Sequence, residues 1–247
     1  MQAFLIAGGN LVWHGIVLSL KKQTKMKSVR FISVATMLMA GVVSYAQKTI
    51  SEGTVTYDIS IQSKNNGSKP NSSLKGSTTV VYLKGALTRT DMTSTLGTET
   101  TIYNAKIGNA AILKEYSGQK LMITLTKENW DARNKKFDGI TFENTAETKV
   151  IEGYNCKQAV ANLKDGSALS VFYTSDLIPV NKEYSQAFKN LPGFPLEYEF
   201  ETEKLILKYS LTNIDFSPVA ASRFDFPKSG YRIMTYDENR KGKSEEQ

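Results

Sequence analysis

Alternation of apolar and polar residues over many short segments is the feature of this sequence that most restricts its fold. In the segment 54–61, Val55, Tyr57 and Ile59 alternate with threonine, aspartate and serine. The segments 196–201 and 205–216 show the same period of two. Side chains that alternate in this way lie on opposite faces of a β-strand. Because antiparallel sheets tolerate one face in water, the sequence predicts a mainly antiparallel β-protein.

Turn residues divide the alternating sequence into separate strands. Lys84-Gly85, Ser117-Gly118 and Glu152-Gly153 are examples of such breaks, and they indicate a meander of hairpins. Strands are expected at 53–63, 74–83, 86–94, 98–104, 109–116, 119–126, 147–151, 155–163, 167–174, 196–202, 205–216 and 231–236. No linker divides this part of the chain, so we expect one β-rich domain over 47–236, followed by a charged, flexible tail over 237–247.

Two segments have the residue spacing of short helices. Asn181 is a suitable cap for a helix that ends before Pro192-Gly193 and places Tyr184, Phe188 and Leu191 on one side. A second, weaker candidate covers 127–137 and contains Trp130. The predicted fold class is mainly β: a strongly curved antiparallel sheet or incomplete barrel, with one or two short helices on its concave side.

The segment 26–46 has the three parts of a signal peptide. Lys27 and Arg30 precede the apolar run 31–43, and Ser44-Tyr45-Ala46 supplies small residues before Gln47. We expect cleavage after Ala46. The apolar run is shorter than the roughly 20 residues that cross a bilayer, so no stable membrane span is expected after processing. Residues 1–25 contain another apolar stretch, interpreted as a start-site artefact or an extra apolar segment.

The residue inventory excludes the common catalytic arrangements. His14 is the one histidine and lies in the leader, and Cys156 is the one cysteine. The expected mature chain therefore has no Ser-His-Asp triad, no Cys-His pair and no imidazole ligand for a metal. Cys156 is expected to be a buried strand residue. We predict a non-enzymatic protein with no catalytic residues, no metal site and no cofactor.

Charged residues in this sequence are also interpreted as solvated surface. The first 46 residues contribute five of the 31 basic residues and none of the 24 acidic ones, so the remainder is nearly neutral and nucleic acid is not an expected partner. Glu197, Glu199 and Glu201 share one strand face, with Lys204 and Lys208 available as partners. A basic cluster near Trp130 comprises Lys127, Arg133, Lys135 and Lys136; we expect Trp130 to pack on the sheet while these charges face water.

Several motifs in the second half of the chain resemble a known family. They are the segments 151–157 (IEGYNCK), 171–179 (VFYTSDLIP) and 191–197 (LPGFPLE), and the ending 226–234 (FPKSGYRIM). Together they are similar to the GLPGLI family of secreted Bacteroidota proteins and a related family of unknown function, although the 191–195 turn falls between the consensus turns of the two. The resemblance implies an exported domain whose fold is related to the LolA/LolB-like half-barrels, and it supplies no catalytic residues.

The concave face and the predicted lid are the candidate binding surface. An apolar cavity of this kind is the usual location of a ligand site. We expect an envelope protein, periplasmic or secreted from a Gram-negative cell, that binds a hydrophobic or lipid-like ligand. The residues expected to contact it are Val55, Tyr57, Ile59, Trp130, Phe188, Leu196, Tyr198 and Phe200. The alternative is a structural or interaction module of the envelope, with a filled core and no ligand cavity.

The signal peptide prediction can be tested by intact-mass analysis of the exported protein. We expect a mature N-terminus at Gln47, because Ala46 completes the small-residue pattern before it. A product that retains Met1 and partitions into membranes would contradict this prediction.

Overall fold

The computed structural model describes residues 47–64, 76–202 and 205–245. The predicted signal peptide over 26–46 and the segment 1–25 lie outside the described residues. Within the described residues, no helix is both long and apolar enough to span a membrane.

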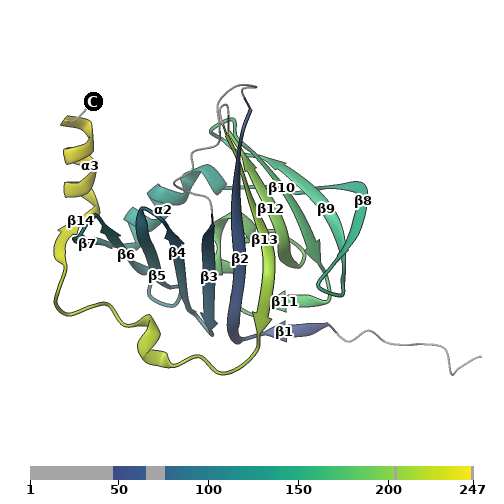
Figure 1. The fold of residues 1–247 in the computed structure, drawn as a ribbon, viewed down its shortest axis with the longest axis horizontal. Coiled ribbons are helices and arrows are strands. Elements are labelled where there is room, and N and C mark those ends of the chain that lie inside the picture. The colour runs from purple at the N-terminus through teal and green to yellow at the C-terminus, as the bar shows by residue number, and fades with distance from the viewer. Residues whose placement is uncertain (1–46, 65–75, 203–204, 246–247) are drawn as a thin grey trace, which may run out of the picture. The chain divides into compact units, whose positions relative to one another are not determined.

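One large open sheet dominates the described structure (Figure 1). Its strands lie in the order β14-β7-β6-β5-β4-β3-β2-β13-β12-β10-β9-β8. All neighbouring pairs are antiparallel except β14 and β7, which are parallel. The strand bounds are β2 (Glu52–Ser63), β3 (Ser77–Lys84), β4 (Leu87–Ser94), β5 (Gly97–Asn104), β6 (Asn109–Tyr116), β7 (Gln119–Leu125), β8 (Glu143–Ile151), β9 (Tyr154–Asn162), β10 (Ala168–Thr174), β12 (Phe194–Glu201), β13 (Leu205–Asp215) and β14 (Arg232–Thr235).

The predicted fold class is confirmed. The described chain is mainly β, and its sheet curves without closing because the edge strands β14 and β8 do not pair with each other. Two short strands that the alternation does not reveal, β1 (Lys48–Ile50) and β11 (Leu177–Pro179), form a separate parallel pair. Three residues are too few to display a period of two, which explains why both were missed.

Two tight hairpins fix the register of their strands. Ser117 and Gly118 join β6 to β7 with φ of 52° and 78°, and Glu152 and Gly153 join β8 to β9 with φ of 47° and 80°. Positive φ at both central residues is the signature of the type I′ turn, whose twist matches that of paired strands. The predicted breaks at both sites are therefore confirmed, and they set which side chains face the interior.

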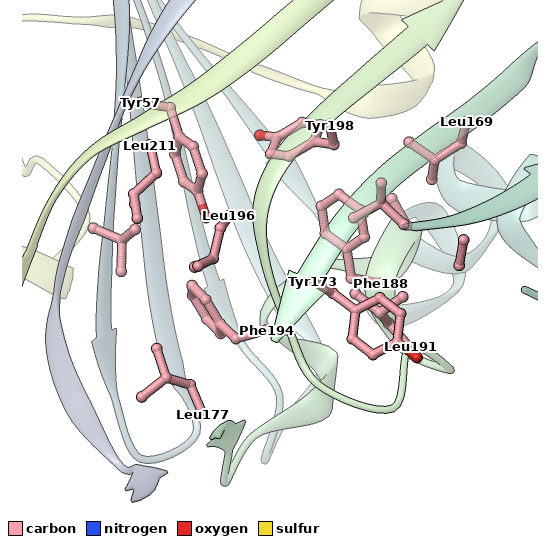
Figure 2. Close-up of a cluster of buried hydrophobic side chains, with 14 of the residues drawn as sticks. Tyr57, Leu169, Tyr173, Leu177, Phe188, Leu191, Phe194, Leu196, Tyr198 and Leu211 are labelled. Atoms are coloured by element: carbon pink, nitrogen blue, oxygen red, sulfur yellow. The ribbon is translucent and has the colours of Figure 1, made fainter. Parts of the chain in front are cut away.

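The main hydrophobic core lies on the inner face of the sheet. Figure 2 shows its side chains converging from β2, β10, β11, β12 and β13. Leu169, Phe194 and Leu196 in this core have no exposed surface. Burial of each such side chain contributes on the order of 1.5–3 kcal/mol, so this cluster is the principal source of the curved sheet's stability.

The outer face of the β3–β7 half is covered by the chain that follows β13. Phe224 in the 3₁₀ helix η6 (Ala221–Phe224) and Val219 before it pack on Ile102 and Met122. The backbone N–H of Val219 donates to Glu52 Oε1 over 2.6 Å. This segment crosses the sheet to reach β14 (Figure 1), which explains why β14 runs parallel to β7.

The helices agree only partly with those predicted from the sequence. The predicted helix over 127–137 is present as α2 (Lys127–Asn134) and the 3₁₀ helix η3 (Lys135–Phe137). The prediction of one α-helix from Asn181 to Leu191 was wrong: two 3₁₀ helices, η4 (Lys182–Tyr184) and η5 (Gln186–Phe188), occupy this segment. Ser185 between them has extended backbone (φ −145°, ψ 121°), so the α-helical ladder cannot continue through it.

The N-terminal cap and the buried residues of the 181–191 segment agree with the prediction. The expected cap is real, because the Asn181 side chain accepts a hydrogen bond from the Glu183 N–H. Ala187, Phe188 and Leu191 are still buried.

At the C-terminus, where a charged, flexible tail is expected over 237–247, residues Tyr236–Glu245 form helix α3.

The turn before β12 gives a test of the packing. A Cβ atom on Gly193 would lie 2.1 Å from the carbonyl oxygen of Thr174 and 2.8 Å from its carbonyl carbon. Because β10 and β12 pair directly here, neither backbone can move alone. We expect Gly193→Ala to lower the free energy of unfolding by about 2 kcal/mol or more, measured by urea denaturation.

Gly242→Ala in α3 is the matched control. A Cβ atom there meets nothing within 4 Å, and alanine favours the helix. We expect this variant to be at least as stable as the parent protein. Equal stabilities of the two variants would contradict the packing described for the 192–195 turn.

Candidate functional site

The sheet and the short helices border an open cavity of about 380 Å³. Its walls come from the inner faces of β2–β5 and β12, and its cover comes from α2, η3 and the η4–η5 segment. A second cavity of about 210 Å³ shares Phe188, Tyr198 and Phe200 with the first and extends toward Tyr209. The volume of the first lies within the roughly 300–1,000 Å³ range of small-molecule sites.

Aromatic side chains form one end of the cavity. The Tyr198 ring lies edge-on to Tyr57, with centroids 5.4 Å apart, and to Phe188, with centroids 4.8 Å apart. It also stacks on Tyr209 at 4.5 Å and contacts Phe200 at 5.9 Å. Figure 2 shows Tyr57, Tyr198 and Phe188 lying around the same interior space. These rings come from β2, β12, β13 and η5, so the apolar end of the cavity exists only in the folded sheet.

Threonine hydroxyls line the opposite wall. Thr79, Thr88, Thr90 and Thr101 all border the cavity from β3, β4 and β5. Strand register places them on one face, because Thr79 pairs with Tyr57 and Thr90 pairs with Thr101. This wall can therefore form hydrogen bonds where the aromatic end cannot.

Helix α2 covers the threonine wall and extends to the aromatic end. Trp130 stacks on Tyr103 of β5 with ring centroids 4.4 Å apart. Phe137 in η3 lies 6.4 Å from the Phe200 ring of β12. Arg133, between these two anchor points in the sequence, also borders the cavity. A capping box between Thr126 and Asn129 fixes the start of the helix.

Three buried polar atoms around this cavity lack partners among the described residues. They are Trp130 Nε1, Thr88 Oγ1 and the Tyr184 hydroxyl oxygen. Trp130 is 8% exposed and Thr88 is 3% exposed. An unsatisfied buried polar group costs on the order of 1–3 kcal/mol. Each of these atoms has almost no accessible surface, so none of them faces the open space of the cavity.

The candidate residues from the sequence divide into two groups. Tyr57, Trp130, Phe188, Tyr198 and Phe200 border the cavity. Val55, Ile59 and Leu196 do not line it; all three are buried, and Val55 and Leu196 belong to the main core.

The polar lining of the cavity was not predicted from the sequence. Thr88, Tyr103, Tyr184 and Arg133 all contribute to it. Arg133 is exposed, as expected for this basic cluster, and it also borders the cavity. Its position three residues after Trp130 was the available signal, since residues at this spacing share a helix face.

The tyrosines that line the cavity have raised pKa values. Burial raises the pKa of Tyr57, Tyr184 and Tyr198 well above the usual value of a phenol. Burial and the nearby Glu183 carboxylate raise the pKa of Tyr103 to about 12. These phenols are therefore neutral at physiological pH and act only through hydrogen bonds and ring contacts.

The glutamate row on β12 forms ion pairs on the other face of the sheet. Glu197 lies 2.6 Å from Lys149 Nζ and 2.8 Å from Lys208 Nζ, and Glu199 lies 3.2 Å from Lys208 Nζ. Burial opposes ionisation of Glu197, but these lysines outweigh it and lower the pKa of its carboxyl. The expectation of paired surface charge is confirmed for Lys208; Lys204 lies outside the described residues.

In the part of the chain that the structure describes, no group of three or more His, Cys, Asp or Glu side chains is arranged to hold a metal.

Cys156 borders a separate cavity of about 350 Å³ together with Lys149 and Asp176. The thiol is 2% exposed and donates to the Tyr154 carbonyl oxygen over 3.5 Å. Burial raises its pKa to about 11. The thiolate is therefore scarce at neutral pH, which agrees with a structural strand residue.

Comparisons with known proteins give distant likenesses of fold. No protein-family model matches the chain, so the resemblance to the GLPGLI family stays a prediction. No curated protein matches it in sequence. The chain is similar to the structure of PNGF-II (TM-score 0.46, 16% identity), covering 78% of this chain and 33% of that one. It therefore spans about a third of the length of PNGF-II.

Two further solved structures are similar over much of the chain. MucB matches with a TM-score of 0.36 and 10% identity over 74% of this chain and 60% of that one. The Mycobacterium tuberculosis lipoprotein LppX matches with a TM-score of 0.37 and 10% identity over 68% of this chain and 88% of that one. Likenesses this distant carry no argument about a ligand or an activity.

The reactivity of Cys156 is open to direct measurement. At about pH 8, a pKa of about 11 leaves on the order of one thiol in a thousand ionised. We expect Ellman's reagent to label the folded protein very slowly and the protein in guanidinium chloride rapidly. Labelling at the same rate in both conditions would show an accessible, reactive thiol and contradict its structural role.

Proposed function

We propose that this protein is a non-catalytic binding protein that holds a hydrophobic, lipid-like molecule in the cavity under α2 and η4–η5. The observation that carries this proposal is the cavity of about 380 Å³ with an aromatic end built around Tyr198. Rings arranged in this way offer large apolar area at fixed geometry, which favours binding of an apolar group.

The alternative, a structural or interaction module of the envelope, requires a filled concave face. The cavity of about 380 Å³ on the inner face of the sheet argues against it. A filled concave face would leave no space of this size between the sheet and the α2 and η4–η5 segments.

The proposed location is the envelope of a Gram-negative cell, periplasmic or secreted. Support for this comes from the sequence 26–46, with its basic start, apolar run and small residues before Gln47. Carriage or storage of a poorly soluble molecule in an aqueous compartment is a task that a pocket of this chemistry suits.

Binding can be tested with the neutral, apolar fluorophore N-phenyl-1-naphthylamine. We expect its emission to increase and shift to shorter wavelength when it is titrated with the protein, with saturation near one molecule per chain. Thr101→Trp should weaken this binding by at least about tenfold, because the larger side chain fills space that borders the cavity.

Thr98→Trp is the matched control on the same strand. Thr98 points to the opposite face of β5 from Thr101, since successive strand residues alternate. This variant should bind the fluorophore as the parent protein does. Emission no greater than in buffer, or equal binding by the two variants, would contradict the proposed site.

A further inference from the structure

We infer that the apolar part of the ligand is an extended alkyl chain of about ten carbons, which lies lengthwise along the inner face of β4 and β5. This inference rests on the proposed function and specifies the class of molecule bound: a straight-chain lipid, as opposed to a compact fused-ring one.

The two cavities on the inner face of the sheet adjoin each other. Thr90 and Thr101, which are cross-strand partners on β4 and β5, line both the cavity of about 380 Å³ and that of about 210 Å³. Phe188 and Phe200 on the opposite wall also line both. The space open to a ligand therefore extends beyond the first cavity, along the strands.

Strand register gives the combined length of the two cavities. On β4 the lining runs from Thr88 to Met92, and on β5 it runs from Tyr103 to Glu99. Thr88 pairs with Tyr103 and Met92 pairs with Glu99, so both strands give the same span. At roughly 3.3 Å per residue, this span is about 13 Å. With C–C bonds of about 1.5 Å, an extended alkyl chain of about ten carbons has a similar length.

Aromatic side chains follow this whole length. Trp130 lies at the α2 end of the first cavity. Phe188 and Tyr198 lie where the two cavities adjoin, and Tyr209 borders the second one. Successive methylene groups of a straight chain can each meet one of these rings, whereas a compact molecule meets the rings of one cavity alone.

The strand residues between the two ends of this space are uncharged. Among the described residues that line the cavities, Arg133 and Glu99 are the charged ones. Arg133 is exposed on α2, and the Glu99 carboxylate lies 3.3 Å from Lys114 Nζ at the far end. The floor between the ends is formed by Thr90 and Thr101. An alkyl chain on this floor therefore desolvates no charged group of β4 or β5.

The carboxylate of Glu183, near the α2 end, is already compensated. It accepts a hydrogen bond from the Tyr103 hydroxyl over 3.2 Å and lies 2.6 Å from Lys189 Nζ. Glu183 does not line either cavity. It therefore leaves the apolar preference of this end unchanged.

A series of alcohols measures the length of the site. 1-Hexanol, 1-octanol, 1-decanol and 1-dodecanol compete against N-phenyl-1-naphthylamine for the protein. We expect affinity to increase about fourfold for each added methylene group up to 1-decanol, as burial of that group provides, and by less than about twofold per methylene group beyond it. An increase that ends at 1-hexanol would overturn the inference.

Met92→Trp tests the far end of the site. The larger side chain fills space that borders the second cavity alone, so 1-hexanol should bind within about twofold of its parent affinity. The ratio of the 1-hexanol to the 1-decanol dissociation constant should fall by at least about tenfold, because the end of the longer chain loses its place. Unchanged binding of 1-hexanol also shows that the variant is folded.

Thr93→Trp is the matched control. Thr93 is the next residue on β4, is exposed and lines neither cavity, because successive strand residues face opposite sides. This variant should keep the parent ratio. A parent ratio in Met92→Trp, or an equal fall in both variants, would contradict a chain that extends to Met92.

The remaining outcomes separate this inference from the proposed function. 1-Adamantanol has as many carbons as 1-decanol in a compact cage, and it should bind at least about tenfold more weakly. If the two bind equally, the chain inference is wrong and the proposed function stands. If the protein binds neither the fluorophore nor any alcohol, the proposed function itself fails.

Discussion

The packing of Tyr198 is the interaction on which the rest of this structure depends. Its ring meets Tyr57 of β2, Tyr209 of β13, Phe200 of β12 and Phe188 of η5. Three central strands and the cover are thereby joined at one buried point. A sheet of twelve strands exposes too much apolar surface to remain flat and open in water, and curvature around these rings buries much of its inner face. The cavity is the part of that inner face that the rings and the short helices do not fill.

Stability and binding place opposite demands on this interior. The β9–β13 half is closely packed, with Phe194, Leu196 and Leu169 fully buried. The β3–β5 half instead presents threonine hydroxyls under α2, with Trp130 Nε1 and Thr88 Oγ1 left unpaired. Unpaired buried polar groups reduce stability, so the packed half must compensate for the polar half. The packed core of β9–β13 and the open cavity beside β3–β5 thus lie on the same inner face of the sheet.

Strand positions could be predicted from the sequence because a period of two is a local property. Val55, Tyr57 and Tyr198 were placed on the inner face from alternation alone, and the positive-φ turns at 117–118 and 152–153 follow from their glycines. The first half of β8 was missed because it lies at an exposed sheet edge, where neither face is apolar. The 3₁₀ breaks around Ser185 depend on packing across the sheet, which spacing along the chain does not encode.

The candidate site was predictable only in its apolar part. Five of the eight residues expected to bind a ligand border the cavity, whereas the donors that give it polarity were not recognised. Arg133 was one of several basic residues in sequence, and only the fold separates it from its paired neighbours.

Native mass spectrometry of the protein isolated from its own envelope tests the central claim most directly. We predict a complex whose excess mass is released on denaturation as one hydrophobic, lipid-like molecule per chain; a protein of bare polypeptide mass that also takes up no added apolar fluorophore would contradict the account.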